Sequence, residues 1–348
     1  MKCVSLFSGC GGLDLGVEQA GFRVVMANDN ELLCKRSADI NFPHTKFIVD
    51  SIENLSPDII ENSLNGEGVN DVALLIGGPP CPPFSKSRFY RKDKPRGLDD
   101  PIGNTTVNGY LSVLAALKPQ AFLFENVHGF AYKVHKEAFN HVLDTAERLG
   151  YSCTWEVVNA ADYGVPQIRK RFILVGTRST KKFKFPKPTH CDPKKLDSKE
   201  KLRPWRNAGD VLIDIDTDEK ASDEGHFAGG KHHDLLCQVP PGDNYLYFTE
   251  KRGHPNPKFI WRSRYWSFLL KLSPDLPSWT IQARRSNNMG PLHWRNRILR
   301  IEEVKRLQTF PDSWYLAGNI EQQWRQVGNA VPPLLAKQIA VSIKEHLS

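Results

Sequence analysis

The chain has 348 residues, of which 40% are hydrophobic and 25% charged, a composition typical of globular proteins. No stretch approaches the ~18 consecutive apolar residues of a membrane span, and the N-terminus reaches glycine before a secretory signal could form. We therefore expect a cytoplasmic protein without a membrane segment. A net charge of +8 would attract a polyanion if it were concentrated on one face.

In chain order, short β-rich runs alternate with helical stretches up to about residue 178. The predicted strands cover 4–7, 23–27, 72–76, 121–124, 152–158 and 172–175. The predicted helices between them cover 13–20, 57–64, 107–117 and 135–149. This alternation predicts an α/β fold with a doubly wound, mostly parallel sheet.

After Gly176 the chain becomes rich in lysine and proline, and an acidic stretch follows at 210–224. Aromatic and cationic residues then concentrate between about 240 and 297, and helical periodicity returns at 301–310 and 333–347. We expect three parts: a first domain (1–178), a smaller irregular domain (179–321), and a C-terminal helical segment that completes the first domain (322–348).

The first predicted strand leads into the segment LFSGCGGLDLG. Glycines at positions 9, 11 and 12 would let the backbone approach a ligand, and the helix that follows favours an anionic group. Asp14 replaces the third glycine of the dinucleotide fingerprint, which argues against a hydride-transferring enzyme. Asp29 ends the second strand, where nucleotide-binding folds hold ribose hydroxyls. A structural turn with a capping acid is the alternative interpretation.

The segment ALLIGGPPCPPFS places Cys81 in a loop stiffened by four prolines at the end of a predicted strand. Open α/β sheets bind ligands beyond the carboxyl ends of their strands, so a thiol held there is a candidate nucleophile. A small buried structural cysteine is the alternative. The seven cysteines include no CxxC pair and no cysteine–histidine cluster at zinc-ligand spacing, so we expect neither disulfides nor a metal site.

Two further segments contribute candidate site residues. FLFENVHGF ends a strand at Glu125, which could act as an acid in the same crevice or simply be a solvated carboxylate. In DYGVPQIRKRFILVG, Arg169 and Arg171 alternate and so should point the same way, towards a phosphate or a base carbonyl. A solvated edge strand would explain the two arginines equally well.

Taken in order, these segments resemble the DNA (cytosine-5) methyltransferase family of bacterial restriction-modification type, over nearly the whole chain. FSGCGG is similar to its cofactor loop, GGPPCPPFS to its catalytic loop, ENV to its base-binding strand end, QIRKR to its arginine motif, and RLQTFP and QVGNAVPP to its C-terminal blocks. The resemblance implies S-adenosylmethionine as cofactor and double-stranded DNA as substrate. It also implies that 1–178 is the catalytic and cofactor-binding domain and that 179–321 is the target-recognition domain. The implied cofactor-binding residues are Phe7, Ser8, Gly9, Gly11, Gly12, Asp29, Asp50, Pro79, Asn329 and Ala330.

The resemblance also implies a mechanism in which Cys81 adds to C6 of a flipped-out cytosine. Glu125 would act at N3 and Arg171 at O2, with Arg169 in the same catalytic group. The implied DNA-binding residues are Ser85, Arg284, Arg285, Asn287 and Asn288, for the last four of which a solvated loop is the alternative.

The sequence departs from the family pattern at three positions: Pro82, where many members have glutamine, Ile102, where arginine is usual, and Ala330, where some carry serine. We interpret these as subfamily variation. An RNA (tRNA) cytosine-5 methyltransferase and a catalytically silent DNA-binding relative are the rival functions. The long recognition segment disfavours the first, and the intact catalytic residues disfavour the second. We also expect a partner restriction endonuclease and a monomeric protein.

Overall fold

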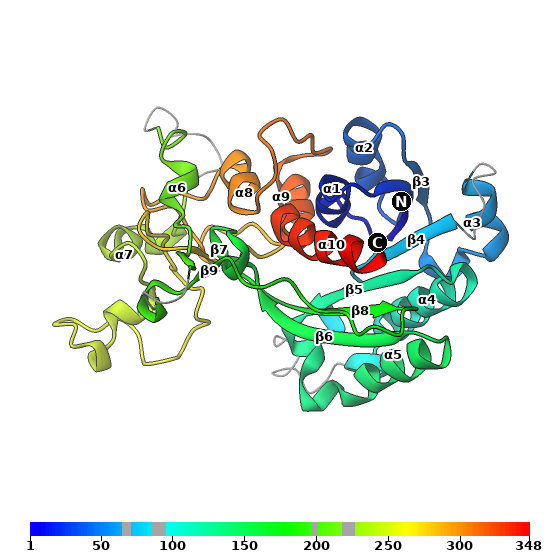
Figure 1. The fold of residues 1–348 in the computed structure, drawn as a ribbon. Helices are drawn as coiled ribbons and strands as arrows, with labels where there is room; N and C mark the ends of the chain where they lie inside the picture. Colours follow the sequence, from blue (N-terminus) through cyan, green and yellow to red (C-terminus); the bar gives the residue numbers. More distant parts are fainter. Residues whose placement is uncertain (65–70, 85–94, 197–200, 218–226) are drawn as a thin grey trace.

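The computed structural model describes residues 1–64, 71–84, 95–196, 201–217 and 227–348 (Figure 1). A seven-stranded sheet with the order β3-β2-β1-β4-β5-β8-β6 forms its centre. The strands are β1 (Lys2–Leu6), β2 (Arg23–Asp29), β3 (Lys46–Val49), β4 (Val72–Gly77), β5 (Ala121–Val127), β6 (Ser152–Asn159) and β8 (Lys170–Thr177). From β3 to β5 each neighbouring pair is parallel, whereas β8 runs antiparallel to β5 and β6. The predicted mostly parallel α/β sheet is confirmed.

Helices cover both faces of this sheet. They are α1 (Gly12–Gln19), α2 (Leu32–Asn41), α3 (Pro57–Ser63), α4 (Pro101–Leu117), α5 (Lys136–Arg148) and α10 (Pro333–Leu347). Successive residues of a strand point to opposite faces, so Leu74 of β4 packs into one hydrophobic cluster and Leu75 into the other. Both side chains are fully buried, which accounts for the unbroken apolar run that made β4 predictable.

The last helix packs against the first. A Cβ atom on Gly16 of α1 would lie 2.4 Å from Cβ of Ala336 and 2.4 Å from the carbonyl oxygen of Pro333, so only glycine permits this approach. Figure 1 shows α10 beside α1, with the C-terminus close to the N-terminal strand. The end of the chain therefore supports the helix that follows the glycine loop.

Residues 178–300 form a lobe of short elements joined by irregular chain (Figure 1). Its regular pieces are β9 (His190–Cys191), β10 (Arg203–Pro204), α6 (Gly209–Leu212), α7 (His233–Gln238) and β11 (Ser278–Trp279). β11 pairs with β7 (Gln167–Ile168), which ties the lobe to the sheet. The lobe continues into α8 (Ile301–Leu307) and α9 (Ile320–Asn329).

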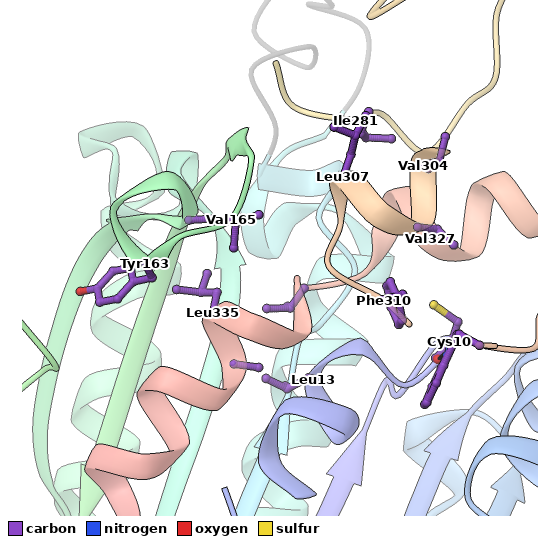
Figure 2. Close-up of a cluster of buried hydrophobic side chains, with 14 of the residues drawn as sticks. Cys10, Leu13, Tyr163, Val165, Ile281, Val304, Leu307, Phe310, Val327 and Leu335 are labelled. Atoms are coloured by element: carbon purple, nitrogen blue, oxygen red, sulfur yellow. Dashed lines mark hydrogen bonds between the residues drawn. The ribbon is translucent and has the colours of Figure 1, made fainter. Parts of the chain in front are cut away.

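One hydrophobic cluster runs from the lobe to the central sheet. Figure 2 shows part of it, with Ile281 of the lobe above Leu307 of α8 and Val327 of α9, and with Cys10 and Leu13 of the glycine loop below. This continuity fixes the lobe relative to the carboxyl edge of the sheet. Over the described ranges, no helix has the length and apolar character needed to cross a membrane.

Candidate active site

A cleft of about 1160 Å³ opens at the carboxyl edge of the parallel strands, between the sheet and the lobe. Ligands of open α/β folds bind at this edge. All four predicted catalytic residues line it, as do eight of the predicted cofactor residues: Phe7, Ser8, Gly9, Gly12, Asp29, Asp50, Asn329 and Ala330. Gly11 and Pro79 lie outside the lining.

Cys81 lies four residues beyond the end of β4 and is partly exposed on the cleft wall. Its carbonyl oxygen accepts a 2.9 Å hydrogen bond from the backbone N–H of Phe84. The fully buried Asn126 donates from Nδ2 to the carbonyl oxygen of Pro79 at 3.2 Å, which holds the loop against β5. Prolines and this bond together restrict the position of the thiol.

The surroundings of Cys81 favour the thiol over the thiolate at rest. The pKa of Cys81 is raised to about 11: removal from water is the main cause, the negative charge of Glu125 adds to the rise, and the positive charges of Arg171 and Arg169 oppose it. A nucleophilic cysteine must lose this proton before it attacks. The charge of Glu125 is therefore the feature through which a substrate could change the state of the thiol.

Glu125 and Arg171 meet because β8 runs antiparallel to β5, which brings the first residues of β8 to the carboxyl edge of the sheet. Arg171 Nε donates to Glu125 Oε1 at 2.8 Å, and both side chains are at most 10% exposed. Burial raises the pKa of Glu125 even though Arg171 and Arg169 counteract the shift. A carboxyl group whose pKa is raised by burial is better able to carry a proton and to act as an acid.

Arg169 was expected to point the same way as Arg171, towards a phosphate or a base carbonyl, but its guanidinium is buried within the protein. It is 1% exposed, and its Nη atoms donate to the carbonyl oxygens of Ile281 (3.1 Å), Gly328 (2.9 Å) and Ala330 (2.9 Å). These bonds join the end of β7 to the segment after β11 and to the end of α9. The geometry is that of a residue that positions the cleft walls.

At the opposite end of the cleft, the carboxylate of Asp29 accepts from the backbone N–H of Gly9 at 2.9 Å and of Glu31 at 3.0 Å. Burial raises the pKa of Asp29, and these two bonds counteract the rise. Gly9 has a φ of +58° and no atom within 4 Å of a Cβ position, so it leaves open space beside this carboxylate. Gly11 differs, since a Cβ there would meet the Phe42 ring at 2.4 Å.

Asp50 follows β3 on the same side of the cleft. Its Oδ1 accepts from Nδ2 of Asn54 at 2.8 Å, and its carbonyl oxygen accepts from Nδ2 of Asn28 at 2.9 Å. Two carboxylates beside an open glycine offer acceptors for hydroxyl and amino groups. This donor and acceptor set fits the nucleoside part of S-adenosylmethionine.

Four of the five expected DNA-contacting residues lie in the lobe, outside the cleft lining. Arg284 and Asn287 are exposed, Asn288 is partly buried, and Arg285 forms an ion pair with Glu321 at 3.2 Å. Ser85 lies outside the described residues. No group of three or more potential metal ligands occurs within the described ranges.

Three positioning residues escaped prediction as site residues: Asn28, Asn126 and Gln167. The Gln167 side chain donates to the carbonyl oxygen of Leu307 at 3.3 Å and accepts from the backbone N–H of Ile281 at 3.2 Å. Each is a buried amide within two residues of a predicted site residue. Asn28 and Asn126 lie near the carboxyl ends of the apolar strands β2 and β5, and this placement is the sequence feature that could have revealed them, because buried amides need hydrogen-bond partners. Gln167 begins the short strand β7 and carries no such signal.

Comparisons with known proteins identify the family of this chain. The family model of the C-5 cytosine-specific DNA methylases matches residues 1–345. The chain is 38% identical to the type II methyltransferase M.SacI of Streptomyces achromogenes, over all of this chain and 93% of the relative. It is 32% identical to M.NgoPII of Neisseria gonorrhoeae, over all of this chain and 96% of the relative.

Among solved structures, Spodoptera frugiperda DNMT2 has the same fold, with a TM-score of 0.62 at 19% identity over 99% of each chain. The Entamoeba histolytica methyltransferase EhMeth superposes with a TM-score of 0.61 at 17% identity, over 100% of this chain and 99% of the other. Because the family model matches almost the whole chain, this protein belongs to the C-5 cytosine-specific DNA methylases and is a DNA cytosine-5 methyltransferase.

Proposed function

We propose that this enzyme methylates a flipped-out cytosine through a covalent adduct between Cys81 and C6 of the base. The convergence of Cys81, Glu125 and Arg171 on one cleft supports this proposal. C5 of cytosine is a poor nucleophile by itself. A bond from Sγ to C6 makes C5 electron-rich and able to attack a methyl group.

The proposed steps use these side chains in order. The thiol proton of Cys81 first passes to the carboxylate of Glu125. As the Sγ–C6 bond forms and the C5–C6 double bond opens, Glu125 delivers this proton to N3 and Arg171 hydrogen-bonds O2, so charge on the ring is neutralised. S-adenosylmethionine, when bound, supplies an electrophilic methyl group for attack by C5. Loss of the C5 proton to a base and return of the N3 proton to Glu125 then allow the Sγ–C6 bond to break, which releases 5-methylcytosine and the thiolate.

The ordering of charges supports a substrate-triggered thiolate. While Glu125 is ionised, its charge and the dry surroundings keep Cys81 protonated. Once Glu125 carries a proton and donates it in a hydrogen bond to N3 of the cytosine, this repulsion is gone, and the positive charges of Arg171 and Arg169 favour the thiolate. Attack is then coupled to correct placement of the base.

For the cofactor, we propose that Asp29 accepts from the ribose hydroxyls and Asp50 lies near the adenine amino group. Phe7, Ser8, Gly9 and Gly12 would form the wall after β1, and Asn329 and Ala330 the wall after α9. Gly11 and Pro79 would support these walls from behind. Arg169 would hold the two cleft walls together rather than touch the base.

The target base of duplex DNA has to leave the helix to reach Cys81, at a cost of about a few kcal/mol. We propose that the lobe between 179 and 321 grips the DNA, with Arg284, Arg285, Asn287 and Asn288 among its contacts. The division of the chain at 178 and 321 stays a prediction. The likeness to type II methyltransferases supports a partner restriction endonuclease, and action on one strand at a time supports a monomer in the cytoplasm.

The adduct can be trapped with a duplex that carries 5-fluorocytosine at the target position. Fluorine cannot leave C5 as a proton does, so the Sγ–C6 bond should persist after methyl transfer. We expect wild-type enzyme to become covalently linked to this DNA at the Cys81 peptide, and Cys81→Ser to form no linkage. Linkage at another cysteine would contradict the mechanism.

A further inference from the structure

Two tryptophans stand at the lobe side of the cleft. The ring centroids of Trp266 and Trp279 are 5.7 Å apart and their planes meet at 70°, an edge-to-face pair. Trp279 lines the cleft, and Trp266 beside it is 51% exposed. Indoles contribute large apolar areas, so such a pair at the rim of a catalytic cleft suggests a partner that covers it.

The backbone that presents Trp266 is held by buried side chains. The carbonyl oxygen of Trp266 accepts from Nδ2 of Asn244 at 2.8 Å, and Asn244 is fully buried. The hydroxyl of Tyr245 donates to the carbonyl oxygen of Arg264 at 2.8 Å and accepts from its backbone N–H at 3.2 Å. The exposed indole therefore projects from a preorganised segment, which lowers the entropy lost on contact.

Trp279 is fixed relative to the catalytic residues. It belongs to β11 and pairs with Ile168 of β7, and the hydroxyl of the next residue, Thr280, donates to the carbonyl oxygen of Ile168 at 2.8 Å. Arg169, which follows directly in the chain, leads to Arg171 in β8. In Figure 1, β7 lies where the lobe meets the sheet. The indole pair thus has a defined place beside the pocket for the target base.

The surface around Trp266 has the chemistry of a nucleic-acid contact. Arg262 and Arg264 are exposed in the same segment, and exposed aromatics interleaved with cations suit stacked bases and phosphates. A cytosine that leaves the duplex leaves its guanine partner unpaired, with a face uncovered. We infer that the Trp266 indole, supported by Trp279, stacks against this unpaired guanine. The inference rests on the proposed base flipping.

In this arrangement Trp266 is a positioning residue, because the stack stabilises the opened duplex and so holds the cytosine in the cleft. The effect requires the guanine. The rate loss caused by removing the indole and the rate loss caused by removing the guanine should therefore not add, since either change alone abolishes the same contact.

The test compares single-turnover methylation of two duplexes that contain the site sequence found by mapping. One has guanine opposite the target cytosine, and the other has an abasic site there. For Trp266→Ala we expect about tenfold slower methylation of the guanine duplex, within the range of a lost base–aromatic stack, and wild-type rates on the abasic duplex. Trp266→Phe, which keeps a ring, should lose less.

Trp155→Ala is the matched control, since Trp155 is 44% exposed but lies on β6, outside the cleft lining. For Trp155→Ala, the ratio of the methylation rate on the guanine duplex to that on the abasic duplex should equal the wild-type ratio. An equal loss for Trp266→Ala on both duplexes, or no loss on either, would overturn the inference. If wild-type enzyme methylates neither duplex, the proposed function itself fails, and the inference with it.

Discussion

The guanidinium of Arg171 and the carboxylate of Glu125 form a 2.8 Å ion pair across β8 and β5, beside the thiol of Cys81. The pair keeps two charges of opposite sign at one edge of the sheet, and the two charges shift the pKa of Cys81 in opposite directions. Disturbing one member should therefore affect the thiol in a predictable direction.

Glu125→Gln removes the negative charge that raises the pKa of Cys81. Alkylation of Cys81 by iodoacetamide at pH 8 should become faster than in wild type, because a larger fraction is thiolate. Methyl transfer should nevertheless fall by about 10²–10⁴-fold, since the proton for N3 is lost. Mass spectrometry of the Cys81 peptide measures the first effect, and the exposed Cys237 serves as an internal control. Slower alkylation of Cys81 would contradict the charge argument.

The pH dependence of the same alkylation gives a separate prediction. In the free enzyme the pKa of Cys81 is about 11, above the ordinary value of 9.0, so the thiol is protonated at neutral pH. Its reaction rate should rise steadily from pH 7 to 10 without levelling, whereas a thiol with an ordinary pKa begins to level near pH 9. A plateau below pH 8 would show that the resting cysteine is already a thiolate.

Arg169→Met should destabilise the protein more than it alters the chemistry of the base. The substitution leaves the carbonyl oxygens of Ile281, Gly328 and Ala330 without their buried donor, at a cost of about 3 kcal/mol or more in the free energy of unfolding. Urea denaturation measures this loss. Unchanged stability together with abolished methyl transfer would instead assign Arg169 to direct contact with the substrate.

Asp29→Asn should weaken S-adenosylmethionine binding about tenfold or more, because a charged acceptor of hydroxyl hydrogen bonds becomes neutral. The affinity for DNA should not change, since Asp29 lies at the other end of the cleft from Cys81. Equilibrium binding of each ligand separates the two effects, and Asp39→Asn on the outer surface of α2 is the matched control. Equal weakening of both ligands would contradict the assignment.

Strands whose residues are buried on both faces could be predicted from the sequence, whereas two partly exposed elements could not. The strands around β4 are continuous apolar runs with both faces covered, so their sequence predicts them. β3 has four residues at the edge of the sheet, two of them with exposed side chains, and the residue before α2, Glu31, makes no side-chain cap. Neither element has a clear sequence pattern, so neither was predicted.

The cleft itself was only partly predictable. Strand-end positions indicated that Cys81, Glu125 and Asp29 share an edge, because parallel strands bring their carboxyl ends together. The role of Arg169 was not predictable, since its three carbonyl partners come from segments more than a hundred residues away in the chain. Alternation alone placed Arg169 and Arg171 on one face but could not distinguish a buried clamp from a substrate contact.

The most direct measurement is transfer of labelled methyl groups from S-adenosylmethionine to mixed genomic DNA and to tRNA, with wild type and Cys81→Ser compared and the modified bases mapped. We predict label at C5 of cytosine within one DNA sequence, and none with Cys81→Ser. Label that survives this substitution, or that enters tRNA alone, would contradict the account.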